Sequence, residues 1–157
     1  MKRIVALSAA IVAGTMLVPA SAGAIIQLER GIAGARLGNT KAEVKTALGQ
    51  PTRVRNGTNE FGPFTVFVYA GGIRVTFQSG NTVTAVTTKG LGDRTSRGVG
   101  VRSTLAAVQQ RVPGVNCDTF GALTICQRGQ GLPGERISAF FVRNGRVTRV
   151  TVGFVID

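Results

Sequence analysis

The chain contains no histidine and no tryptophan, and it has only one tyrosine. Without histidine, the common nucleophile–base triads and most zinc sites cannot be built. Acidic residues are also few: seven aspartates and glutamates, scattered over loops, a helix cap and the last position. No two of them have the setting expected of a general acid and its base. The sequence therefore predicts a protein that is not an enzyme and that has no catalytic residue, metal or cofactor.

Long hydrophobic runs are absent after the first segment of the chain. There, a basic start precedes an apolar run over residues 4–18, which Pro19 ends before a zone of small residues. This pattern is typical of a cleavable signal peptide, which we assign to residues 1–24, with cleavage after Ala22 or after Ala24. The alternative, a transmembrane anchor, needs about 20 apolar residues. The sequence therefore predicts a secreted, extracytoplasmic protein with no transmembrane anchor after cleavage.

Cysteine is limited to one pair, Cys117 and Cys126. In an exported protein, the default state of such a pair is a disulfide. The enclosed segment contains Gly121, which can turn the chain, so we expect a stapled hairpin or loop. The alternative, a free catalytic thiol, needs an activating base, and the chain has no histidine to supply one.

Positive charge far outweighs negative charge. The formal net charge is +12 at pH 7, and after the signal peptide fourteen of the seventeen cations are arginines. Codon usage in a GC-rich genome would produce that skew without a functional meaning. The functional interpretation is a surface that attracts an anionic partner, which leaves an unknown protein or an anionic envelope component as partner. Export, the lack of tryptophan and the lack of a recognisable motif argue against nucleic acid.

Two separate segments of the chain share a helical pattern. Residues 37–48 have apolar side chains at helical spacing, with Thr40 and Glu43 placed as a capping box. Residues 101–112 align over them without a gap, with Thr104 in the place of Thr40. The shared spacing predicts two related helices.

The strands that follow these helices repeat at the same offset. Residues 73–87 align without a gap over residues 137–151, and each segment holds a turn of glycine and asparagine. The sequence thus predicts an α+β fold of two tandem helix-plus-antiparallel-sheet repeats, with the sheet face opposite the helices exposed. The expected divisions are a signal peptide (1–24), repeat 1 (25–90; helix about 40–48, strands about 64–69, 73–78 and 83–88), a linker (91–100) and repeat 2 (101–157; helix about 103–112, strands about 122–127, 136–143 and 147–155).

The turn at residues 144–145 indicates which side chains share a face, because opposed residues of a hairpin lie on the same side. A regular hairpin pairs Phe140 with Arg149, which places both outside and places Phe141 in the core. Interfaces favour aromatic residues and arginine. The alternative is that another element covers this outer side. The candidate binding face consists of Arg74, Thr76, Gln78, Phe140, Val142, Arg149 and Thr151.

Residues 37–44 and 48–51 resemble the "Leu-Gly-Met-Thr-x-x-x-Val … Leu-Gly-x-Pro" motif of the SmpA/OmlA family, small proteins of the outer-membrane assembly machinery. Asn39 stands where that motif has methionine. The doubling, and the cysteine pair after a helix, look more like the secreted β-lactamase inhibitory proteins. This resemblance implies two helix-plus-sheet repeats whose joined sheet offers a concave face to a partner protein.

Three functions remain open at this point. The first is a secreted, non-enzymatic module that binds a protein through the sheet face or the rim loops. The second is an arginine-rich extracytoplasmic binder of anionic polymers or membrane surfaces, whose affinity would fall steeply with salt. The third is a structural component of the cell envelope.

Overall fold

The computed structural model describes residues 25–156, so the predicted signal peptide lies outside the described residues. The described chain is mostly β-structure, with two short α-helices. In chain order its elements are β1 (Ile25–Gln27), β2 (Gly31–Ile32), β3 (Ala35–Arg36), α1 (Lys41–Leu48), β4 (Arg53–Asn59), β5 (Gly62–Val68), the 3-10 turn η1 (Ala70–Gly72), β6 (Arg74–Gln78), β7 (Ala85–Thr88), β8 (Arg94–Thr95), α2 (Leu105–Arg111), β9 (Val115–Phe120), β10 (Leu123–Arg128), β11 (Arg136–Arg143) and β12 (Arg146–Phe154).

Eight strands form one large sheet in the order β4-β5-β6-β7-β12-β11-β10-β9. Every neighbouring pair in this sheet is antiparallel. The β7–β12 ladder is the seam between the strands of the two chain halves, where the hydroxyls of Thr87 and Thr151 lie 2.9 Å apart. A second, small sheet has the order β3-β2-β1-β8, in which β1 and β8 are parallel.

The expectation of an α+β fold with two tandem helix-plus-sheet repeats is wrong. The helices have only 8 and 7 residues, the chain is mostly strand, and two sheets are present instead of a sheet for each repeat. One reason is that the edge strand β4 is polar and almost wholly exposed, so it lacks the apolar alternation that marks a strand in sequence. What recurs between the two aligned segments is local bonding: the Val83 amide donates to the Asn39 carbonyl, and the Val147 amide donates to the Ser103 carbonyl.

Both helices are fixed by threonine N-caps and by one buried valine each. The Thr40 hydroxyl accepts from the Glu43 amide, and the Glu43 carboxylate accepts from the Thr40 amide, so the capping box is complete. Thr104 caps α2 through its hydroxyl. Val44 and Val108 are fully buried against the sheet, so packing on the sheet, more than helix propensity, holds these short helices.

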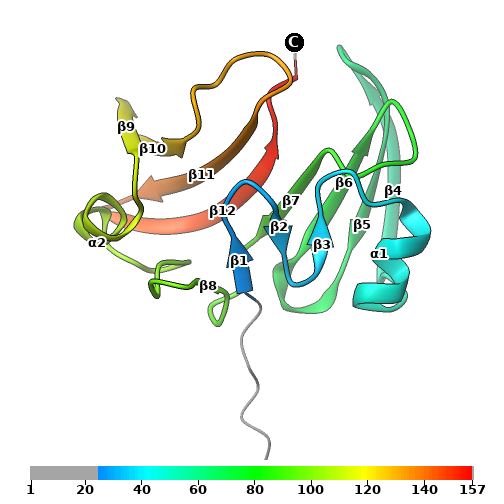
Figure 1. Cartoon of the computed structure of the whole chain (residues 1–157), viewed down its shortest axis with the longest axis horizontal. Helices are drawn as coiled ribbons and strands as arrows, with labels where there is room; N and C mark the ends of the chain where they lie inside the picture. Colours follow the sequence, from blue (N-terminus) through cyan, green and yellow to red (C-terminus); the bar gives the residue numbers. More distant parts are fainter. Residues whose placement is uncertain (1–24, 157) are drawn as a thin grey trace, which may run out of the picture.

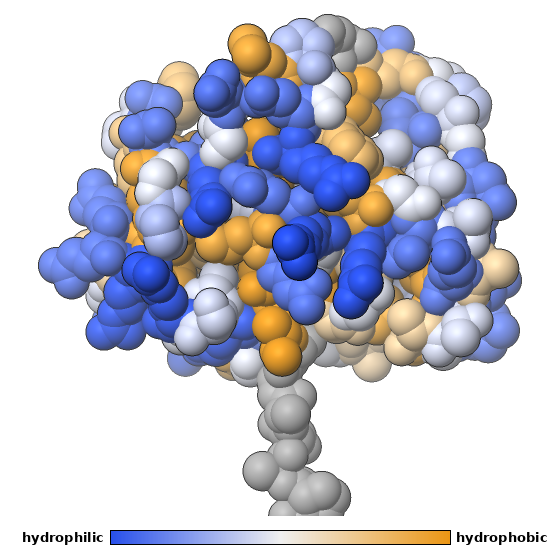
Figure 2. Space-filling view, in the orientation of Figure 1, coloured by the Kyte–Doolittle hydropathy of each residue, from blue (hydrophilic) through white to orange (hydrophobic). Residues whose placement is uncertain are grey.

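The helices and the small sheet cover one face of the large sheet. Strands β1, β2 and β3 lie in front of it between α1 and α2 (Figure 1). On this side, hydrophilic side chains lie over much of the surface with hydrophobic ones between them (Figure 2). The core lies beneath and includes Ile26 and Ile32 of the small sheet, with Phe77 and Phe140 of the large one. No helix within residues 25–156 is long and apolar enough to cross a membrane.

The segment 91–100, expected as a linker, is packed into the fold. It contains β8, and Val99 is fully buried. Asp93 is also buried and accepts a hydrogen bond from the hydroxyl of buried Thr88. Gly100 is also buried, and a Cβ there would lie 2.0 Å from the Asp93 carbonyl oxygen, so this end of the segment is closely packed.

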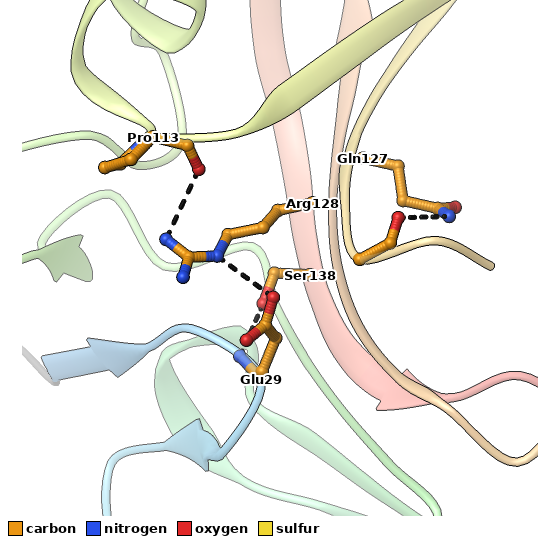
Figure 3. A network of polar contacts seen from close by, with 6 residues as sticks. Glu29, Pro113, Gln127, Arg128 and Ser138 are labelled. Atoms are coloured by element: carbon orange, nitrogen blue, oxygen red, sulfur yellow. Dashed lines mark hydrogen bonds and ion pairs between the residues drawn. The ribbon is translucent and has the colours of Figure 1, made fainter.

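A polar network fastens the turn after β1 to the covered face (Figure 3). Arg128 donates from Nε to the Glu29 carboxylate over 3.0 Å and from Nη1 to the Pro113 carbonyl over 3.3 Å. The Glu29 amide donates to the Ser138 hydroxyl at 2.7 Å. These contacts join the start of the described chain to β10 and β11, which come much later in the sequence.

The predicted disulfide is confirmed. Cys117 and Cys126 are bonded, and they are directly opposed in the β9–β10 ladder. The bond therefore closes the outermost hairpin of the sheet at its free edge.

Candidate functional site

The face of the large sheet opposite the helices carries a continuous set of side chains from all eight strands. The pairing registers identify its members, since opposed residues lie on the same side and the side alternates along a strand. We call this surface the free face. Its residues include Arg53, Arg55 and Gly57 (β4), Phe64, Val66 and Val68 (β5), Arg74, Thr76 and Gln78 (β6), Ala85 and Thr87 (β7), Arg149, Thr151 and Gly153 (β12), Ile137, Ala139, Phe141 and Arg143 (β11), Leu123, Ile125 and Gln127 (β10), and Asn116, Asp118 and Phe120 (β9).

The free face combines arginine with aromatic and aliphatic side chains. Its arginines are all exposed, whereas most of its apolar side chains are half-buried between neighbours. Phe120 stands out, with 64% of its surface exposed. Asp118 is the one acid among these residues, and the one ion pair of residues 25–156, Arg128–Glu29, lies on the covered side. The free face is therefore a positively charged surface with apolar patches and no internal counter-charge at its arginines.

A β-bulge in the β11–β12 hairpin sets the face of each side chain there. Val142 pairs with Val147, but Phe141 pairs with Arg149, so Thr148 is the extra residue. The Thr148 hydroxyl donates to the Phe141 carbonyl at 3.0 Å. The bulge exchanges the two sides of β11 relative to a regular hairpin.

This exchange corrects the expected register. Phe140 pairs with Val150, not with Arg149, and it is 0% exposed. Val142 is likewise buried, at 2% exposure. Both were predicted on the binding face and both belong to the core, as the alternative of a covered face allowed. Phe141, expected in the core, lies on the free face.

The remaining predicted residues share the free face. Arg74, Thr76 and Gln78 lie together on β6, while Arg149 and Thr151 lie on β12. Gln78 is half-buried, and its side-chain amide donates to Asn59 and to the Gly62 carbonyl, so it ties strand ends together.

Sequence reasoning missed the aromatic residues of the free face. Phe141 contacts Arg149, whose guanidinium lies 3.7 Å from the centre of its ring. Phe64 lies over Gly57 of the edge strand, because a Cβ at Gly57 would come within 2.6 Å of its Cζ. Phe64 belongs to a strand that is apolar at nearly every position, so alternation gave no signal of its side.

Three hollows open on the free face. The first, of about 290 Å³, is called the basic hollow and is lined by Lys89, Leu123, Phe141, Arg143, Thr148 and Arg149. The second, of about 270 Å³, is lined by Arg55, Asn56, Phe64, Val66, Val68 and Arg74. The third, of about 390 Å³, is lined by Asn116, Asp118, Phe120, Ile125, Gln127, Gly129 and Gln130.

Two groups on the covered side, Tyr69 and Glu43, have shifted pKa values. Burial raises the pKa of Tyr69, whose hydroxyl donates to the Gly49 carbonyl at 3.3 Å. Two hydrogen bonds lower the pKa of Glu43: the larger effect comes from the Thr40 amide and the smaller one from the Thr40 hydroxyl. Within residues 25–156, no three acidic or cysteine side chains cluster as a metal ion would require.

No protein-family model matches the chain, and no curated protein matches it significantly. Among solved structures, it is similar to a DUF4309 family protein, YjgB, from Bacillus subtilis, at 18% identity and a TM-score of 0.49, over 78% of this chain and 84% of that one. It is also similar to an extracellular SCP-domain protein from Bacillus anthracis, at 10% identity and a TM-score of 0.48, over 75% of this chain and 44% of that one.

A third similar structure is a cysteine-rich secretory protein from Staphylococcus aureus, at 9% identity and a TM-score of 0.48, over 75% of this chain and 44% of that one. The chain spans less than half the length of the Bacillus anthracis and Staphylococcus aureus chains. None of these three is an outer-membrane assembly protein or a β-lactamase inhibitory protein. Likenesses this distant carry no argument about function.

Proposed function

We propose that this chain is an exported, non-enzymatic module that binds an acidic surface of a partner protein through its free face. One observation carries the proposal: exposed arginines without an internal counter-charge alternate with aromatic and aliphatic side chains over one uncovered sheet face. Positive and negative patches pair across protein interfaces, which sets both the register and the association rate. The partner surface should therefore be acidic.

The size of the free face fits a protein partner. Eight strands spaced about 4.8 Å apart span about 34 Å, and outward side chains on one strand repeat about every 6.8 Å. With about three outward residues per strand, the face covers roughly 700 Å², close to the roughly 800 Å² that each partner contributes to a standard interface. One such contact would use most of the face.

The mixture of side chains favours a protein over an anionic polymer. A polymer needs cations alone, whereas protein interfaces are enriched in aromatic residues and arginine. Here Phe141 packs directly beneath the guanidinium of Arg149, and Phe120 exposes most of its ring. Apolar surface of this kind stays attractive at salt concentrations that screen charge.

Export is supported by the pattern of residues 1–24 and by the disulfide. A basic start, an apolar run and a small-residue zone are the parts of a signal peptide. Cysteine pairs of this kind persist in oxidising compartments, and Cys117 and Cys126 are bonded.

A polymer-binding function has one observation in its favour. On the covered side, Arg30, Arg36 and Arg136 line a hollow of about 390 Å³ together with Gln27 and Leu37. An anionic polymer would bind clusters of cations over the whole surface of this basic chain. Removing a positive charge at any position would therefore weaken polymer binding to a similar extent. This difference separates the two functions.

The test begins with capture of partners from the secreted and envelope fraction of the producing cell, on the immobilised protein at low and at high salt. A captured protein is then purified and its binary affinity measured by calorimetry. We expect Arg74→Asp and Phe141→Ala to weaken binding at least 30-fold, the size of a hot-spot loss of about 2 kcal/mol. The matched control, Arg111→Asp in the last turn of α2, should bind as the unmodified protein does.

Two results would overturn the proposal. In one, Arg74→Asp and Phe141→Ala bind the purified partner with unchanged affinity. In the other, only polymer or membrane material is retained, moderate salt releases it, and Arg111→Asp weakens retention as much as Arg74→Asp. The second result would establish the polymer-binding function.

A further inference from the structure

The basic hollow brings three cations together beside an apolar wall. Lys89, Arg143 and Arg149 line it together with Leu123, Phe141 and Thr148, and its volume is about 290 Å³. No acidic side chain lines the hollow. Within residues 25–156, neither an ion pair nor a side-chain hydrogen bond engages the three cationic groups.

The sheet itself forces these charges together. The β7–β12 ladder ends with Thr88 opposite Val150, so the next residues along the two strands, Lys89 and Arg149, lie side by side. Like charges at neighbouring positions of adjacent strands are destabilising. None of the described residues places a carboxylate beside these cations to offset the repulsion. Uncompensated positive charges of this kind are expected where an external anion binds.

The bulge orients one of the three cations. It sets Arg149 opposite Phe141, and the guanidinium stacks over the ring at 3.7 Å from its centre. A cation held on an aromatic face in this way is already ordered before a ligand arrives. Its N–H groups lie in the plane of the guanidinium, so its edge stays available for the two oxygens of a carboxylate.

We infer that the basic hollow receives a glutamate side chain of the partner protein. Its carboxylate binds between Arg149, Arg143 and Lys89, and its methylene groups pack on Leu123 and Phe141. A phosphate group has no apolar part to use that wall. The inference deepens the proposed function and rests on it, since the glutamate belongs to the acidic surface that the free face binds.

The probe is the tripeptide N-acetyl-Ala-Glu-Ala-amide, titrated into the purified protein and followed by two-dimensional amide NMR. We expect saturable shifts at the amides of Arg143, Thr148 and Arg149. The same peptide with glutamine in place of glutamate should bind at least tenfold more weakly. The double variant Arg143→Gln/Arg149→Gln should lose binding at least tenfold, with its spectrum otherwise still that of the folded protein.

A matched control removes the same charge elsewhere. Arg97 and Arg111 are exposed and line none of the hollows on the free face. Arg97→Gln/Arg111→Gln should bind the glutamate peptide as the unmodified protein does. If this variant loses binding as strongly as Arg143→Gln/Arg149→Gln, net charge alone explains the effect and the inference is wrong.

Two further outcomes would also overturn the inference. One is that inorganic phosphate causes the same shifts with equal or higher affinity, which would make the hollow a general anion site. The other is that the glutamate peptide causes no saturable shift there. The failure of this inference can be told apart from the failure of the proposed function. If the partner protein still binds Arg143→Gln/Arg149→Gln but no longer binds Arg74→Asp, the free face remains the interface and only the inference of a bound glutamate is wrong.

Discussion

The β-bulge in the last hairpin determines which of two adjacent phenylalanines belongs to the core. Phe140 is 0% exposed and is opposed by Cys126 on one side and Val150 on the other. Phe141 is half-buried on the free face beneath Arg149. Replacing each phenylalanine by alanine therefore tests the register directly.

The two replacements should lower the free energy of unfolding by different amounts, with the larger decrease for Phe140→Ala. Phe140→Ala removes a buried ring and leaves a cavity, which costs about 3–5 kcal/mol of unfolding free energy. Phe141→Ala removes a half-exposed ring and one cation–π contact, so about 1–2 kcal/mol is expected. For a chain of this size, each kcal/mol corresponds to roughly 3 °C in the melting temperature, so Phe140→Ala should melt about 10–15 °C lower and Phe141→Ala about 3–6 °C lower.

Urea unfolding followed by far-ultraviolet circular dichroism measures both values, with an unchanged slope against denaturant as the sign that the unfolded states are comparable. The chain has no tryptophan, so the dichroism signal is the primary probe. Equal costs, or a larger cost for Phe141→Ala, would refute the reasoning, because that order belongs to a regular hairpin without a bulge.

Three other predictions concern stability and local structure. Cys117 and Cys126 are 9 residues apart, and closing so short a loop in the unfolded chain is worth about 2–3 kcal/mol. Replacing both cysteines by alanine should therefore lower the free energy of unfolding by about 2–3 kcal/mol, and a decrease under about 1 kcal/mol would contradict this prediction. The Glu43 carboxylate accepts hydrogen bonds from the Thr40 amide, which has the larger effect, and from the Thr40 hydroxyl, and both hold the pKa of Glu43 below 4.5. The stability that these bonds add is therefore present above pH 4.5 and is lost as the pH falls through the lowered pKa. Melting curves of Glu43→Gln between about pH 5 and pH 3 should lack that acid-dependent part, and identical pH profiles for variant and unmodified protein would show that the cap is not coupled to folding. Alanine at Gly57 would place its Cβ 2.6 Å from Cζ of Phe64, so the ring must swing outward and its proton resonances must shift; unchanged resonances would mean that the ring does not lie over the glycine.

The helices could be predicted from sequence because their signals are local. A threonine followed three residues later by glutamate marks the start of α1, and the structure has that capping box. The buried Val44 and Val108 fall at the apolar positions of the two helical patterns. Capping and helical spacing involve residues within one or two turns, so neither depends on the rest of the fold.

Most of what was missed depends on distant partners. β2 and β3 have two residues each, too few for a pattern, and they exist through pairing within the small sheet. β4 is an edge strand with almost no burial, so its polar sequence gives no clear alternation, and β9 alternates only over its first four residues. The predicted fold class is wrong because strand predominates, because the pairing of β7 with β12 joins the strands of both chain halves into one eight-stranded sheet, and because β1, β2, β3 and β8 form a second sheet.

The candidate site was predicted in part. Arg74, Thr76 and Gln78 lie where a regular hairpin puts them, on the face opposite Val75 and Phe77. The predicted side of Phe140 and Val142 was wrong because Thr148 is an additional residue in β12. A threonine in a strand rich in valine and threonine does not by itself indicate a bulge. The same shift hid the arginine–phenylalanine stack at the centre of the basic hollow.

The seam between β7 and β12 has a consequence for the speed of folding. Every other ladder of the large sheet joins strands that follow one another in the chain, and hairpins of this kind form within about 1–10 μs. The seam joins residues 85–88 to residues 150–153, so its closure carries the loop entropy of the long intervening segment. Topologies dominated by such distant pairing fold in roughly milliseconds to seconds. The free face spans this seam, so a newly synthesised chain acquires a continuous free face only after its slowest ladder has closed.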